Sequence, residues 1–201
     1  MKRIMVIVPC HSVKQWTDGC RKSIDKLLTD NRFGDFDIKV NVTEGTVVHM
    51  QYVVGASSIP EYRHWNISIS ETRVFPYEWD LLLCINPKSE FEVDDVVCLI
   101  NHDKDIVSGC PYSQFLPHCK NDYDKIIKRD GIYEVDYVPF HFTLIKREVL
   151  RKIKYPWWKT RIIKTGEPSR AIIMSPEEGF CMSAKEAGIK IYNNFGIEVY
   201  Q

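Results

Sequence analysis

The chain has 201 residues, close to the size of one globular domain, so a single domain spanning residues 1–201 is expected. Its 27 lysines and arginines balance its 27 aspartates and glutamates, which excludes the strong basic field that attracts nucleic acid or anionic membranes. The sequence contains no secretory signal and no apolar run near the roughly 20 residues that span a bilayer. We therefore expect a cytoplasmic protein with no transmembrane segment and no nucleic-acid partner.

Seven cysteines are distributed along the chain, and they predict free thiols rather than disulfides or a zinc site. Their number is odd, and no pair has the C-x-x-C spacing typical of zinc ligands. We expect small core side chains in a reducing compartment. The cysteines are Cys10, Cys20, Cys84, Cys98, Cys110, Cys119 and Cys181.

In the first half of the chain, buried strand patterns alternate with helical patterns. Residues 4–8 form a continuous apolar run ended by Pro9, which is typical of a strand buried on both faces. Pro87 ends a similar run further along the chain. The expected strands are residues 4–8, 37–42 and 80–85, and the expected helices are residues 16–28 and 62–73.

The second half of the chain continues the alternation. Asp94 and Asp95 predict a helix start, because carboxylates accept hydrogen bonds from the free N–H groups there. Residues 111–124 and 157–174 are expected to be loops, the second of them basic. The remaining expected strands are residues 105–108, 133–145, 189–192 and 197–200, and the remaining helices are residues 146–153 and 175–188. This pattern predicts an α/β fold with a mostly parallel sheet, helices on both faces and a ligand cleft at the carboxyl edge.

Four segments, taken in order, resemble the glycosyltransferases of the GT-A fold, near the large family 2 that includes inverting cellulose- and rhamnan-type enzymes. They are residues 4–9, residues 79–95, residues 103–109, and residues 135–158 continued by residues 177–191. The resemblance implies a Rossmann-like GT-A domain that moves a sugar from a nucleotide-diphosphate donor to a hydroxyl acceptor. It also implies inversion at the anomeric carbon.

The sequence departs from this family at its two usual metal-ligand positions. Where the family has Asp-x-Asp, this chain has Asn86-Pro87-Lys88. Where the family often has a histidine after the last strand, this chain ends at Gln201. Such enzymes normally hold Mg²⁺ or Mn²⁺ on carboxylates, and an ammonium repels a cation at close range. We therefore expect no required metal cofactor, with Lys88 opposing the charge of the leaving diphosphate.

Two adjacent carboxylates are candidates for the general base. The resemblance implies Glu177, which lies three residues before Phe180, and Glu178 is the second candidate. The alternative is structural: Ser175-x-x-Glu178 is a capping box, which by itself would explain Glu178. Neither carboxylate needs to be catalytic for the helix to form.

The resemblance also implies a set of donor-binding residues. A lysine just after a buried strand can place its charge against a phosphate, and an arginine can bind a phosphate with two hydrogen bonds. Each residue also has an ordinary alternative: a solvated charge for Arg63 and Lys88, a loop side chain for His11, and a turn residue for Asn86. The expected donor-binding residues are Pro9, His11, Arg63, Asn66, Asn86 and Lys88.

A basic, tryptophan-containing loop is the candidate lid over the donor and acceptor. Tryptophan faces stack on sugars, and cations reach phosphates. The same composition occurs on single-stranded nucleic-acid platforms, which the neutral charge disfavours. His141 is expected to line the acceptor pocket or to be the polar position of an alternating strand. The expected acceptor and lid residues are His141, Trp157, Trp158, Lys159 and Arg161.

Two other functional classes remain as rivals. The first is a catalytically degenerate GT-A domain that binds a glycan or nucleotide without turnover. The second is a nucleotidyltransferase, which is disfavoured because residues 9–13 lack a glycine-rich basic loop after the first strand.

Overall fold

A computed structural model describes most of the chain. The described residues are 1–10, 13–44, 79–109, 131–153, 157–158, 161–164, 171–197 and 199. The predicted helix at residues 62–73 and the predicted loop at residues 111–124 lie outside them, as do His11, Arg63, Asn66 and Lys159. Among the described helices, none is both long and apolar enough to cross a bilayer.

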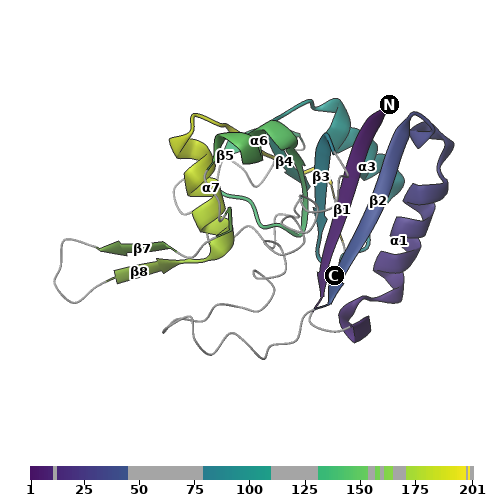
Figure 1. Ribbon diagram of the computed structural model, residues 1–201, viewed down its shortest axis with the longest axis horizontal. Coiled ribbons are helices and arrows are strands. Elements are labelled where there is room, and N and C mark those ends of the chain that lie inside the picture. Colours follow the sequence, from purple (N-terminus) through teal and green to yellow (C-terminus); the bar gives the residue numbers. More distant parts are fainter. Residues whose placement is uncertain are drawn as a thin grey trace.

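Seven of the described strands form one mixed sheet in the order β2-β1-β3-β6-β4-β9-β5 (Figure 1). β1 is parallel to β2 and β3, and β4 is parallel to β9, whereas β5 and β6 run against their neighbours. Five of the seven strands therefore share one direction, and the predicted largely parallel α/β sheet is confirmed. The strands are β1 (Lys2–Cys10), β2 (Phe36–Glu44), β3 (Leu81–Ile85), β4 (Ile106–Gly109), β5 (Ile132–Val135), β6 (Phe142–Lys146) and β9 (Ile191–Asn194).

Helices cover both faces of the sheet, as the sequence predicts. α1 (Asp18–Thr29) and α3 (Val93–Asn101) pack on one face, and α6 (Arg147–Lys152) and α7 (Pro176–Glu186) pack on the other. Alternate residues of β1 point to opposite faces, so its whole apolar run is covered by helices on one side or the other. Two short 3₁₀ turns complete this part of the chain, at Val13–Gln15 and Asn31–Phe33.

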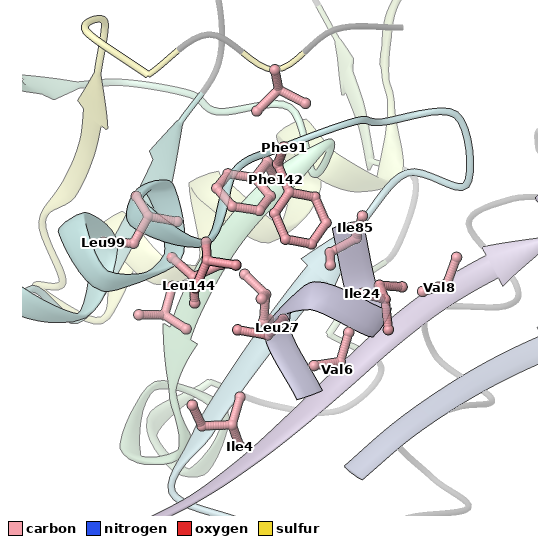
Figure 2. Packing of buried hydrophobic residues seen from close by; sticks show 14 of the residues in the cluster. Ile4, Val6, Val8, Ile24, Leu27, Ile85, Phe91, Leu99, Phe142 and Leu144 are labelled. Atoms are coloured by element: carbon pink, nitrogen blue, oxygen red, sulfur yellow. The ribbon is translucent and has the colours of Figure 1, made fainter. Parts of the chain in front are cut away.

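The core beneath α1 and α3 is built from branched aliphatic and aromatic side chains (Figure 2). Ile24 and Leu27 of α1 pack over Val6 of β1. The Phe91 and Phe142 rings lie 4.9 Å apart. Burying one such side chain stabilises the fold by about 1.5–3 kcal/mol, so this layer contributes strongly to holding α1 and α3 against the sheet.

The expected strand at residues 133–145 is instead two strands on different parts of the sheet. Within the described sheet, β5 pairs with β9 alone, at the edge, whereas β6 lies between β3 and β4. The connection between them contains Pro139, which lacks the N–H group that a sheet interior requires. The apolar alternation continues across this connection because it is also buried, and so the sequence pattern hides the break.

β1 continues through Pro9 instead of ending there. Its ladder with β3 stops at the pair Ile7–Cys84, while its ladder with β2 continues to Cys10–Glu44. Among the described strands, β2 alone therefore flanks β1 at Pro9, a position that proline tolerates.

The expected basic loop at residues 157–174 contains a β-hairpin. β7 (Arg161–Lys164) and β8 (Ala171–Met174) pair antiparallel, with Ile162 opposite Ile173 and Ile163 opposite Ile172. The hairpin extends away from the main sheet (Figure 1). Each strand contains two adjacent isoleucines, a β-forming signal that the surrounding cations obscure in the sequence.

The expected closing strand at residues 197–200 is not a strand where the structure describes it. Ile197 and Val199 are buried in the core beneath α1 and α3 but lie outside the sheet. The chain passes directly over the end of β4, because a Cβ atom on Gly109 would lie 2.5 Å from Ile197 Cγ2. Gly109 therefore makes this close approach possible.

Candidate functional site

The turn after β3 lies at the carboxyl edge of the sheet and contains Asn86, Pro87 and Lys88. The Asn86 backbone N–H donates to the His141 backbone carbonyl over 2.8 Å, and this hydrogen bond joins the end of β3 to the start of β6. Asn86 Oδ1 accepts from the Lys88 amide over 3.0 Å. Asn86 therefore has a clear backbone role, that of an asparagine closing a turn.

The same turn is also held by the start of α1. The Thr17 amide donates to the Pro87 carbonyl over 3.0 Å, and the Cys20 thiol lies 3.8 Å from the Asn86 carbonyl oxygen. Thr17 Oγ1 in turn caps α1 by accepting from the Cys20 amide. The turn is thus fixed between the two segments, and its side chains have a defined position at the sheet edge.

Lys88 is exposed at this edge. Within the part of the chain that the structure describes, its ammonium group forms no ion pair. A positive charge that is anchored through its backbone but left uncompensated is suited to an anionic ligand.

Glu177 lies at the start of α7 and is buried, with 8% of its surface exposed. Its Oε2 atom accepts from the Tyr137 hydroxyl over 2.8 Å, and its Oε1 atom accepts from the Phe140 amide over 3.3 Å. Burial raises the pKa of the Cys84 thiol in β3, and the Glu177 charge raises it further. Glu177 therefore lies beside the end of β3, next to the connection that leads to His141.

Glu178 has a structural partner set of its own. Its Oε2 atom accepts from the Ser175 amide over 2.7 Å, while the Glu178 amide donates to Ser175 Oγ over 3.1 Å. Pro176 occupies the first turn of the helix. The predicted capping box is confirmed, and it accounts for Glu178 without a catalytic role.

His141 connects the two halves of the site. Its carbonyl accepts from the Asn86 amide and from the Ser89 hydroxyl, and it directly follows Phe140, whose amide binds Glu177. Burial lowers the pKa of the His141 imidazole to about 4, so the ring is neutral at neutral pH. A neutral ring can exchange hydrogen bonds with a hydroxyl but offers no charge to a phosphate.

Trp157 and Trp158 lie in the core, where they are 1% and 2% exposed. Trp157 Nε1 donates to the Leu150 carbonyl over 3.0 Å. The Trp158 ring stacks on Phe180 at 4.9 Å and meets Phe140 edge-on at 5.5 Å. Their faces are thus covered by protein, which contradicts the expectation that they stack on a sugar in an open lid. They fill the space between α6, α7 and the sheet instead.

Arg161 is held at the far end of α7 from Glu177. Its guanidinium donates to Glu186 Oε1 over 2.6 Å and to Ser183 Oγ over 2.7 Å. Glu186 lies nine positions after Glu177 in the same helix, so the two are separated by about 13 Å at a rise of about 1.5 Å per residue. Arg161 thus ties the hairpin to α7, and its expected role in the lid stays a prediction.

The residues at the end of β3 do not fit a divalent metal. Asn86 Oδ1 is occupied by the Lys88 amide, and Lys88 adds a positive charge where a metal would need carboxylates. The described residues contain no group of three or more histidine, cysteine, aspartate or glutamate side chains able to hold an ion. Gln201 lies outside the described residues.

Two contributors to the site escape sequence reasoning. Tyr137 and the Phe140 amide hold Glu177 from the connection between β5 and β6, which the sequence pattern presents as continuous strand. The proximity of Tyr137 to α7 can be predicted only if the break between β5 and β6 is known. No spacing signal in the sequence links residues 40 positions apart.

Comparisons with known proteins support the fold class. Scans against protein-family models and curated proteins give no match. Among solved structures, A197 from STIV is similar with a TM-score of 0.55 and 17% identity, over all of this chain and 85% of that chain. S. aureus TarS (residues 1–349) has a TM-score of 0.47 and 14% identity, over 96% of this chain and 57% of that chain.

At this level of identity, the likeness to A197 concerns the fold alone. Together with the mixed sheet and its two helical layers, it confirms the predicted GT-A-like α/β class. The candidate site lies at the carboxyl edge of that sheet, where open α/β folds bind their ligands.

Proposed function

We propose that this protein is a hexosyltransferase-like enzyme of the family 2 type, which moves a sugar from a nucleotide-diphosphate donor to a hydroxyl acceptor with inversion. The observation that carries the proposal is the position of Glu177. Its carboxylate is oriented by the Tyr137 hydroxyl and the Phe140 amide at the carboxyl edge. The next residue, His141, accepts a hydrogen bond from the Asn86 backbone amide, in the turn that carries Lys88. The GT-A-like fold is consistent with this proposal. Because a fold alone does not define chemistry, the proposal rests on the site residues.

Glu177 is the proposed general base. It takes the proton from the acceptor hydroxyl, whose oxygen attacks the anomeric carbon from the face opposite the leaving group. The bond between that carbon and the diphosphate oxygen breaks, and its electron pair stays on the diphosphate. A base and a leaving group on opposite faces give inversion.

Lys88 is proposed to stabilise the departing diphosphate, because a fixed cation near developing negative charge lowers the barrier. The turn that carries it is anchored by Thr17 and His141, so little reorganisation is needed on binding. Pro9 lies at the neighbouring strand end and is proposed to border the nucleoside. The proposed donor residues His11, Arg63 and Asn66 and the proposed lid residue Lys159 lie outside the described part of the chain.

A binding protein without turnover is the second candidate. Both oxygens of Glu177 accept hydrogen bonds from the fold itself, an arrangement that would also stabilise α7 in a protein that catalyses nothing. This observation supports the degenerate binding domain as a second candidate, so turnover has to be tested directly.

The test is a panel of UDP-, GDP- and TDP-sugars, measured for binding by calorimetry and for donor hydrolysis or transfer by product analysis. The enzyme hypothesis expects at least one donor to bind and to turn over. Binding of a donor with no turnover under any acceptor would favour the degenerate domain. Failure of every nucleotide sugar to bind would contradict the enzyme hypothesis and would leave only a glycan-binding form of the degenerate domain.

A further inference from the structure

A second charged cavity lies at the opposite, amino edge of the sheet. Its volume is about 370 Å³, and it is formed by the starts of β1 and β3, the end of β6, and parts of α3 and α6. It shares no residue with the candidate site around Glu177. Its cationic lining residues are Lys2, Arg3, Lys104, Lys146, Arg147 and Arg151.

The carboxylates of this cavity are already matched by some of its cations. Three acidic side chains line it, and each has one basic partner from the same lining. The pairs are Arg3 with Asp80 at 4.0 Å, Lys146 with Asp103 at 2.8 Å, and Arg151 with Glu148 at 2.6 Å. Within the lining, six cations against three carboxylates leave a surplus of three positive charges. One further carboxylate, Asp105, lies beside the lining at 3.9 Å from Lys146 Nζ.

The surplus charges belong to Lys2, Lys104 and Arg147. None of the three forms an ion pair with any residue that the structure describes. Lys104 Nζ lies 4.8 Å from the centre of the Tyr192 ring, which positions the ammonium without neutralising it. The pKa of the Asp103 carboxyl is lowered, first by Lys146 and then also by Lys2 and Lys104, so both of these surplus ammonium groups lie within electrostatic range of Asp103.

We propose that this cavity is a binding site for a phosphate group, held by Lys104 and Arg147 with support from Lys2. A guanidinium fork matches phosphate geometry, and ammonium groups add point charges around it. Since the chain as a whole is neutral, the surplus is a local feature and not general basicity. The phosphate can come from a soluble molecule or from a lipid headgroup, and the site stands independently of the proposed transferase activity.

The primary test is an NMR titration of the full chain with inorganic pyrophosphate. We expect saturable amide shifts at Lys104, Lys146 and Arg147. The double variant Lys104→Ala/Arg147→Ala should bind about tenfold or more weakly, as expected for losing charge-assisted hydrogen bonds. The matched control is Lys22→Ala, an exposed cation of α1 outside the cavity, which should bind as the unmodified protein does.

Several results would overturn the proposal. One is the absence of saturable shifts at these amides in the unmodified protein, a measurement that does not depend on any variant folding. Another is binding that Lys88→Ala abolishes while the double variant binds normally, because the phosphate would then occupy the candidate site at the other edge. Thermal unfolding of each variant verifies that the fold is intact.

A vesicle co-sedimentation experiment distinguishes the two sources of phosphate. Binding to phosphatidylcholine vesicles containing phosphatidylglycerol, absent with phosphatidylcholine alone and lost in the double variant, supports a lipid headgroup. Pyrophosphate binding without vesicle binding supports a soluble ligand. Vesicle binding that the double variant retains would contradict a lipid role for this cavity.

Discussion

The Tyr137 hydroxyl donates a 2.8 Å hydrogen bond to Glu177 Oε2, across 40 residues of sequence. The bond joins the start of α7 to the connection that leads into β6. Since the Phe140 amide holds the other carboxylate oxygen, Glu177 is oriented from two sides. The orientation of the proposed base thus depends on a residue to which the sequence analysis assigns no role.

Replacing this hydroxyl tests whether the orientation matters for chemistry. We expect Tyr137→Phe to lower kcat for transfer by about tenfold or more and to leave the donor Kd unchanged, because a hydrogen bond to a charged group is worth about 1.5–3 kcal/mol. Tyr192→Phe is the control, because it removes a hydroxyl elsewhere on the sheet. If both variants lose stability but keep full kcat, Tyr137 is only structural.

Substitutions of the two adjacent glutamates should have different effects on transfer activity. Glu177→Gln should lower transfer by about 10²-fold or more, the usual scale for losing a general base, while donor binding persists. Glu178→Gln should stay active, because glutamine at this position preserves the capping box. Steady-state kinetics and donor calorimetry provide the comparison. Full activity of Glu177→Gln with inactive Glu178→Gln would reverse the assignment.

Sequence reasoning reaches most of the sheet because its strands are buried on both faces. The runs at β1 and β3 are continuous and apolar, and proline residues lie at or just beyond their ends. The Ser175 capping box marks the start of α7 directly. Such signals are local, so a single sequence is sufficient to reveal them.

The remaining features depend on tertiary contacts that no local pattern contains. Trp157 and Trp158 look like a binding surface in a basic stretch, yet α6, α7 and the sheet enclose them. The break between β5 and β6 is hidden because the connecting residues Val138 and Phe140 are themselves buried. The amino-edge cavity gathers charges from four separate segments and is likewise invisible in the sequence.

Burial of His141 predicts a defined pH dependence of stability. Its pKa is lowered from the ordinary 6.5 to about 4 in the folded state, so the unfolded chain binds a proton more readily between these values. Stability should therefore fall as the pH drops from 6.5 toward 4, by up to about 3 kcal/mol, and level off below 4. Urea unfolding across this range measures the effect. His141→Gln should remove this component, and an unchanged pH profile in that variant would exclude His141 as its source.

Metal dependence should be weak or absent. Because Lys88 places a positive charge in the turn after β3, where a metal would need carboxylates, we expect binding and transfer to persist in excess chelator. Lys88→Asp should weaken donor binding and regain part of it when Mn²⁺ is added. Calorimetry with and without chelator supplies the measurement. Activity that vanishes with chelator and returns with Mn²⁺ would contradict the expectation.

Trp158 should behave as a core residue. Trp158→Ala should lower the free energy of unfolding by about 3–5 kcal/mol, the usual cost of removing a large buried aromatic. Ile162→Ala, at a site that is 65% exposed, should change it by about 0.5 kcal/mol or less. Chemical denaturation compares the two. Loss of glycan binding in Trp158→Ala at unchanged stability would restore the sugar-stacking role.

The position of β6 in the sheet imposes an order on biosynthesis. β6 pairs with β3 on one side and with β4 on the other, yet it follows both in the chain. β1, β2 and β3 can associate as soon as they emerge from the ribosome. β4 must wait for residues 142–146, since both of its neighbours in the described sheet are made later. Until then, the exposed edges of β3 and β4 are open to pairing with other chains, and a nascent chain stalled before residue 142 would be the species most in need of a chaperone.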